Sequence, residues 1–142
     1  MLTPNTRIIK FLHEHHVFAL ATSDQDVPYC ANMFYVFMEE KNMLAFISEK
    51  KTRHIAEAEK NNKIAGAIAL ETETIGLIRG LQIQGLMYKP VGNLKRKATL
   101  AYLKRFPYAL LKGSSVWVIE LTFMKFTDNR LGFGKKIIWK KT

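Results

Sequence analysis

The sequence predicts a mainly β protein of the α+β class, a small antiparallel β-barrel of about six strands with about three attached helices. Six apolar stretches of strand length occur in the 142 residues, and the first three are separated only by short polar turns. Three further segments carry apolar residues at the spacing of amphipathic helices. Hydrophobic residues make up 48% of the chain and aromatic residues 11%, so a buried core is available. Short strands joined in this way close most simply into a small barrel.

The elements follow one another without a linker or an internal repeat, and we therefore expect a single domain over residues 1–142. The predicted helices cover residues 4–16, with Thr3 as the cap, 53–60 and 93–106. The predicted strands cover residues 17–23, 28–38, 43–48, 63–71, 75–90 and 114–127, and residues 135–140 supply a terminal apolar segment.

Turns and glycines set the expected pairing of these strands. Polar turns at residues 24–26 and 39–42 have the short spacing of an antiparallel meander, so the first three strands are expected to pair in chain order. Gly80 and Gly85 lie inside the fifth strand, where glycine marks a bulge or a close approach of two backbones.

The net charge of +10 favours an anionic partner, which would be a nucleic acid, an acidic membrane or a phosphorylated small molecule. No apolar run approaches the roughly 18 residues of a membrane span, and the N-terminal segment is too polar for a signal peptide. We therefore expect a cytoplasmic protein without a membrane partner. Cys30 is the only cysteine, which excludes an intrachain disulfide, and its apolar strand predicts a small buried hydrophobic residue.

Three histidines near the end of the first predicted helix, His13, His15 and His16, invite interpretation as a metal site. Imidazoles at a helix C-terminus are also explained by the helix dipole. No cysteine or carboxylate cluster completes a coordination set, so we expect no metal.

The start of the second predicted helix carries an unusual concentration of basic residues. Lys50, Lys51, Arg53 and His54 surround Thr52, the expected N-cap. The first turn of a helix already has a partial positive charge and unpaired N–H groups, so these side chains repel one another until an anion binds. The spacing therefore indicates a phosphate site, with a solvated basic turn as the alternative that the residues leave open.

Several segments in the right order resemble one known family. Residues 46–65, FISEKKTRHIAEAEKNNKIA, look like the strand–helix–strand element of the FMN-binding split barrels related to pyridoxamine 5'-phosphate oxidase. The segment NMFYV (32–36) is similar to their strand whose backbone bonds the flavin ring edge, and RGLQIQG (79–85) resembles their Arg-Gln-Val-x-Val-x-Gly strand. Residues 126–141 look like the closing signature of a small bacterial subfamily, the YhbP-like proteins. The resemblance implies a six-stranded antiparallel split β-barrel.

The same resemblance implies an FMN site. Arg53 and His54 would hold the phosphate with help from Ser48 and Lys51. Gly80 stands where the family has a glutamine that contacts the flavin, and Gln82, two residues later, could take its place. Because His54 stands where the family has lysine, phosphate affinity is expected to fall as pH rises through neutrality. The implied cofactor-binding residues are Asn32, Met33, Phe34, Tyr35, Ile47, Ser48, Lys51, Arg53, His54 and Gln82.

The resemblance implies a flavin-dependent oxidoreductase that exchanges electrons with a small-molecule donor or acceptor, in a homodimer whose sites use both chains. The Arg-x-His element of the true oxidases is not recognisable, which argues against vitamin B6 oxidation, and no residue is assigned a catalytic role. A non-catalytic module with haem or another anionic cofactor, with histidine ligands, is the alternative. A nucleic-acid-binding protein ranks third, because the basic groups lie in separate segments without a reading motif. Trp117 and Trp139 are expected in the core, or else against the ring.

Overall fold

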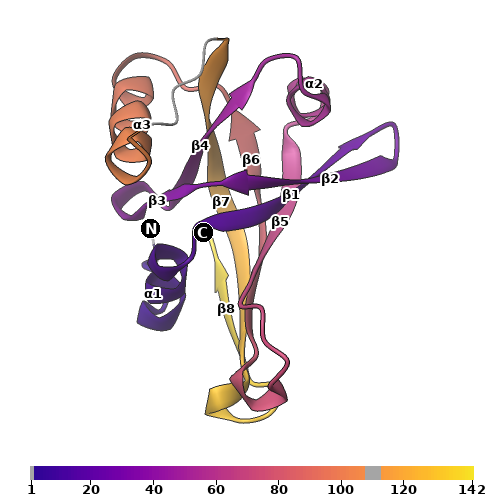
Figure 1. The fold of residues 1–142 in the computed structure, drawn as a ribbon, viewed down its shortest axis with the longest axis vertical. Helices are drawn as coiled ribbons and strands as arrows, with labels where there is room; N and C mark the ends of the chain where they lie inside the picture. Colours follow the sequence, from indigo (N-terminus) through magenta and orange to yellow (C-terminus); the bar gives the residue numbers. More distant parts are fainter. Residues whose placement is uncertain (1, 108–112) are drawn as a thin grey trace.

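The computed structural model describes residues 2–107 and 113–142, in which three helices surround a strongly curled antiparallel sheet (Figure 1). The helices are α1 (Thr6–Glu14), α2 (Arg53–Lys60) and α3 (Gly92–Arg105), with short 3-10 turns η1 (Glu39–Lys41), η2 (Ile75–Leu77) and η3 (Asn129–Leu131). The strands are β1 (Val17–Asp24), β2 (Val27–Phe34), β3 (Val36–Met38), β4 (Met43–Glu49), β5 (Lys63–Ala69), β6 (Arg79–Tyr88), β7 (Ser114–Asp128) and β8 (Lys136–Lys140).

The order of the strands explains why the sheet curls. Within the described residues the order is β2-β1-β5-β6-β7-β4-β3, and β8 pairs with β7 beyond this path. The two ends of the path, β2 and β3, are separated in sequence only by Tyr35, so the sheet must bend round to bring its ends together. Because β2 pairs with β1 while β3 pairs with β4, the barrel is open between β2 and β4. The protein is therefore a split β-barrel, as the family resemblance implies.

The prediction of one continuous strand over residues 28–38 is wrong, because the strand breaks at Tyr35. The expected pairing in chain order is confirmed, since β2 pairs with β1 and β3 pairs with β4, both antiparallel. Tyr35 interrupts the strand because its polar groups are bound by helices. Its hydroxyl donates to the Leu12 carbonyl (2.7 Å), and its backbone N–H donates to the His16 carbonyl (3.0 Å). The Arg105 side chain donates to the Tyr35 carbonyl (3.1 Å) and to the His15 carbonyl (2.5 Å). The ends of α1 and α3 thus fix the point at which the barrel opens.

Two other boundaries differ from the sequence prediction. α1 begins at Thr6, because the side chain of Asn5 accepts the Arg7 N–H (2.9 Å) and caps the helix there, so Thr3 is not the cap. Residues 75–77 form η2, and the strand begins only at Arg79, where pairing with β7 starts. The terminal apolar segment forms β8 and adds to the sheet.

The core lies inside the curled sheet. α1 closes it with Ile8, Phe11 and Leu12, each at most 1% exposed. Trp117 and Trp139 are buried in the same cluster, which confirms the interpretation of both as core residues. Cys30 is exposed, and the expectation of a buried cysteine is wrong, because Cys30 lies on the more exposed face of β2, which is an edge strand of the sheet.

Candidate functional site

A cavity of about 550 Å³ lies where the barrel is split. β2 and the end of β4 form its two sides, and the start of α2, one residue of α3 and the first residue of β7 complete it. The cavity therefore lies between β2 and β4, which do not pair with each other. The lining residues are Asn32, Met33, Phe34, Ile47, Ser48, Glu49, Thr52, His54, Tyr102 and Ser114.

One side of the cavity is a strand edge. In the described part of the chain β2 pairs with β1 alone, so the backbone groups along its other edge are open to a ligand. Met33 points inward and is buried, whereas Phe34 is 54% exposed. The Phe34 ring packs against His16 (centroids 5.9 Å apart) and Phe106 (5.4 Å). A planar ligand can thus bond the strand edge and pack against apolar side chains at the same time.

The opposite end of the cavity is polar. Ser48 Oγ lies 2.7 Å from His54 Nε2, and Thr52 Oγ1 lies 3.1 Å from the same nitrogen. Thr52 is the N-cap residue, as predicted, but its hydroxyl donates to the Glu49 carbonyl (2.9 Å) and makes no cap bond. The first N–H groups of α2 therefore lack a side-chain partner, the usual condition for anion binding at a helix start.

His54 differs from the sequence interpretation in its charge. Its side chain is buried, and burial lowers the pKa of its imidazole below the usual 6.5. The ring is therefore neutral near pH 7 and serves as a hydrogen-bonding partner for the two hydroxyls. The positive charge at this helix start comes from Lys50, Lys51 and Arg53.

Arg53 is held beside the cavity by a second set of contacts. Its Nε donates to Glu57 Oε2 (2.7 Å), one turn along α2, and its guanidinium lies 4.1 Å from the Tyr29 ring centroid. The other carboxylate oxygen of Glu57 accepts the Thr22 hydroxyl (2.9 Å). The hydrogen bond from Arg53 lowers the pKa of the Glu57 carboxyl, so Glu57 is ionised and fixes the arginine.

The cavity unites six of the ten residues that the resemblance implies: Asn32, Met33, Phe34, Ile47, Ser48 and His54. Lys51 and Arg53 lie at the same helix start but outside the lining, and Tyr35 is fully buried. Gln82 lies on β6, paired with Ala67 and Lys125, and is exposed away from the cavity.

Three lining residues had no predicted role in the site: Glu49, Tyr102 and Ser114. A fourth, Thr52, was expected as the N-cap at the phosphate site but was not among the implied cofactor-binding residues. The sequence indicated a site role for Thr52, because the hydroxyl of an N-cap residue lies at the anion-binding end of its helix. Tyr102 and Ser114 come from α3 and the start of β7, and only the tertiary fold brings them to β2 and β4.

Stability should depend on pH through His54. In the unfolded chain the imidazole titrates near pH 6.5, whereas burial keeps it neutral to a lower pH in the folded protein. The unfolded state therefore binds more protons in this window, and stability falls as pH drops through 6.5 towards the lower folded pKa. We expect the melting temperature of His54→Gln to fall less than that of the wild type between pH 7.5 and 5. Parallel curves for the two proteins would contradict this assignment.

The histidines at the end of α1, His13 and the C-cap His15, have separate partners. His13 Nε2 lies 2.8 Å from Glu39 Oε2, and His15 Nδ1 lies 3.0 Å from the Phe11 carbonyl oxygen. Among the residues that the structure describes, no group of three or more His, Cys, Asp or Glu side chains could hold a metal ion.

None of the helices described has the length and apolar character needed to cross a membrane.

No family model matches the sequence. Among curated proteins, the UPF0306 protein YhbP of Escherichia fergusonii is 38% identical over 137 residues, covering 96% of this chain and 93% of the relative. A YhbP protein of Escherichia coli is 39% identical over 134 residues, covering 94% and 91%.

Solved structures agree with the fold. A haem-binding protein from Mycobacterium smegmatis superposes with a TM-score of 0.77 at 15% identity, over 99% of this chain and 60% of that one. A candidate pyridoxamine 5'-phosphate oxidase from Listeria innocua gives 0.66 at 18% identity, over 84% and 94%. A FAD-binding protein from Mesorhizobium loti gives 0.68 at 12% identity, over 85% and 91%.

At such identities the solved structures establish the fold alone, and they include flavin-binding and haem-binding proteins. The curated relatives share more than a third of their residues with this chain over nearly its whole length. The chain therefore belongs to the UPF0306 YhbP family, and its fold is the split barrel of the pyridoxamine phosphate oxidase-like proteins.

Proposed function

We propose that this protein is an FMN-binding flavoprotein that works as a homodimer and exchanges electrons with a small-molecule donor or acceptor. One observation carries the proposal. The cavity in the split combines an unpaired strand edge on one side with an uncapped helix start on the other. These are the two elements that a flat polar ring and a phosphate group require.

The residues present fit FMN. A cavity of about 550 Å³ lies within the roughly 300–1,000 Å³ of small-molecule sites. Met33, Phe34 and Tyr102 supply apolar surface for the ring and exclude water from its face. The hydroxyls of Ser48 and Thr52 and the first N–H groups of α2 would hold the phosphate. Bound FMN would supply the hydride or electron transfer itself.

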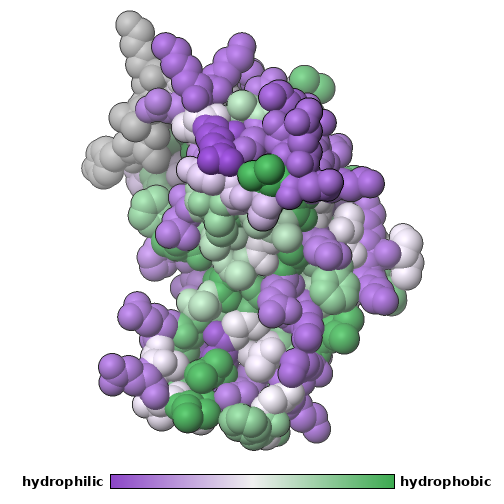
Figure 2. All heavy atoms as spheres, turned by 90° about the vertical axis from the view of Figure 1, so that its right-hand side faces the viewer, coloured by the Kyte–Doolittle hydropathy of each residue, from purple (hydrophilic) through white to green (hydrophobic). Residues whose placement is uncertain are grey.

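The outer face of the sheet supports the proposed homodimer, because it carries a groove that a second copy could cover. Figure 2 shows hydrophilic residues gathered around α2, and hydrophobic and weakly polar residues over the strands below it. A groove of about 520 Å³ on this face is lined by residues of β1, β5 and β6, among them Ala65, Gln84 and Leu86. Gln82 lies two residues before Gln84 and so on the same face of β6. A second copy that covers the groove would therefore also cover Gln82 and could place it at the partner's site.

An absorbance spectrum of the freshly purified protein, followed by FMN and haem titrations with light scattering for mass, tests this proposal. We expect flavin bands or saturable FMN binding, and the mass of a dimer. His54 Nε2 already contacts two hydroxyls, so we do not expect it to ligate haem iron. A Soret band on haem titration without FMN binding would identify haem, and not a flavin, as the cofactor. Binding of neither cofactor would reject the proposal.

A further inference from the structure

A second cavity, of about 370 Å³, lies between α1, the start of β6 and the end of β7 with η3. It shares no lining residue with the cavity in the split. Four of its lining side chains are basic and one is acidic. The lining residues are Arg7, Lys10, Phe11, Glu14, Arg79, Phe126, Arg130 and Leu131.

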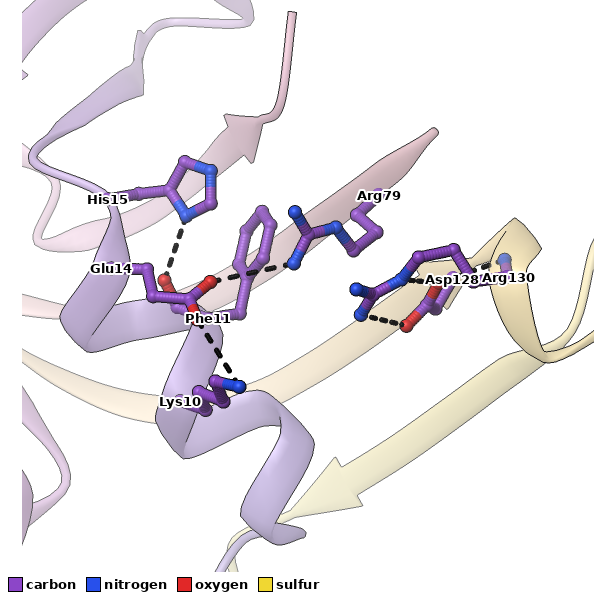
Figure 3. A network of polar contacts seen from close by, with 7 residues as sticks. All are labelled: Lys10, Phe11, Glu14, His15, Arg79, Asp128 and Arg130. Atoms are coloured by element: carbon purple, nitrogen blue, oxygen red, sulfur yellow. Dashed lines mark hydrogen bonds and ion pairs between the residues drawn. The ribbon is translucent and has the colours of Figure 1, made fainter. Parts of the chain in front are cut away.

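Helical spacing and sheet register bring these side chains together. Arg7, Lys10 and Glu14 follow one another at three- and four-residue steps, so they lie on one face of α1. Across the cavity, Arg79 of β6 pairs in register with Asp128 of β7. Figure 3 shows Arg79 between Glu14 and the pair formed by Asp128 and Arg130.

Arg130 is fixed in place by a buried carboxylate. Its Nε and Nη2 donate to the two oxygens of Asp128 at 3.0 and 2.9 Å. Asp128 is fully buried, and these hydrogen bonds hold the pKa of its carboxyl below the usual value. Both oxygens of the Asp128 carboxylate therefore bond Arg130 and orient its guanidinium beside the cavity. Asp128 itself does not line the cavity.

Arg79 has unused hydrogen-bonding capacity. Its Nε is buried and has no hydrogen-bond partner among the described residues. Its Nη1 lies 3.5 Å from Glu14 Oε2, at the limit of a hydrogen bond, and its guanidinium carbon lies 5.9 Å from the Phe11 ring centroid. An unpaired buried donor is costly, so an acceptor that reached this group would be favoured.

The charges of the lining do not balance. Arg130 is paired with Asp128, and the other three cations, Arg7, Lys10 and Arg79, face a single lining carboxylate. This carboxylate, Glu14, is shared between Lys10 (3.7 Å) and Arg79 (3.5 Å). The floor is apolar, with the rings of Phe11 and Phe126 5.0 Å apart. Each ring is only 1% exposed, so the more accessible apolar side chain of the lining is Leu131, which is half-buried. The site thus offers several cationic donors beside a small apolar contact.

We propose that this cavity binds a small molecule carrying a dianionic oxyanion of the phosphate monoester class, with its organic part towards Leu131. Guanidinium groups bond such oxyanions through their N–H donors, and Arg7 and Arg79 line the cavity beside Lys10, while Arg130 adds the N–H groups that Asp128 does not use. The volume suits a small ligand and lies near the lower end of small-molecule sites, roughly 300–1,000 Å³.

Titration of the full-length protein with phenyl phosphate and with inorganic phosphate, followed by calorimetry and amide chemical shifts, tests this site. We expect saturable binding of phenyl phosphate, with inorganic phosphate weaker. Shifts should be confined to residues 7–14, 79–80 and 126–131. Arg7→Gln/Lys10→Gln should weaken binding at least tenfold, whereas Glu14→Gln should strengthen it several-fold, because the competing carboxylate is gone.

The matched control is Lys95→Gln/Lys97→Gln, which removes two exposed charges from α3. It should leave binding unchanged. Equal weakening in this control would show a diffuse charge effect, and shifts confined to residues 47–54 would move the ligand to the split cavity. Either result, or no binding of phenyl phosphate, would overturn the proposal. Arg7 and Lys10 are exposed and uninvolved in the core, so loss of folding does not obscure the test.

Discussion

Replacing Arg53 with alanine should weaken FMN binding by about 100-fold while leaving riboflavin binding nearly unchanged. Riboflavin has the same ring but no phosphate, so the difference isolates the phosphate end of the site. Two effects act in the same direction. The substitution removes a cation from the start of α2, and it leaves the Glu57 carboxylate without the guanidinium that neutralises it. Calorimetric or fluorescence titration of both flavins gives the two affinities.

Two further variants separate these effects. Arg53→Ala/Glu57→Gln removes both charges, so recovery of FMN affinity would show that the loss came from the unpaired carboxylate. A persistent loss would show that Arg53 itself contacts the phosphate. Arg96→Ala removes one arginine from the exposed face of α3, where its side chain bonds Asn93, and should leave both affinities unchanged. An equal loss of FMN and riboflavin affinity in Arg53→Ala would contradict a phosphate role.

The elements of the fold that local sequence determines were predicted well. α2 and β4 appear within a residue of their expected bounds, because an N-cap and a polar turn mark them. The break at Tyr35 was not predictable in this way. Its residue type favours a strand, and the contacts that end pairing come from α1 and from Arg105, 70 residues later.

The candidate site shows the same division. The concentration of cations at the start of α2 was visible in the sequence, and so was Glu57, four residues after Arg53 on the same helix face. The burial of His54, which changes its charge, depends on the packing of the whole site. The exposure of Cys30 depends likewise on which strand ends the sheet, which alternation within one strand does not reveal.

Replacing Gly85 with alanine should lower the free energy of unfolding by about 2–3 kcal/mol, because β6 and β7 approach too closely there for a methyl group. The register shifts between Gln84 and Gly85, as the sequence suggested for a glycine in this strand. A Cβ at Gly85 would lie 2.6 Å from the Glu120 carbonyl oxygen and 2.7 Å from Ile119 Cγ2. The first of these atoms is backbone in the central pairing of the sheet, so it cannot move without disturbing that pairing.

Gly80 in the same strand is the matched control. A Cβ there would meet only the Ile68 carbonyl oxygen, at 3.7 Å, which is an ordinary contact. Gly80→Ala should therefore be neutral or stabilising by about 0.5 kcal/mol, since alanine restricts the unfolded chain more than glycine does. Urea unfolding at one fixed protein concentration measures both variants, because dimerisation would make stability depend on concentration. Equal effects at the two positions would contradict this explanation, because they would mean that the close approach of β6 and β7 does not require glycine at position 85.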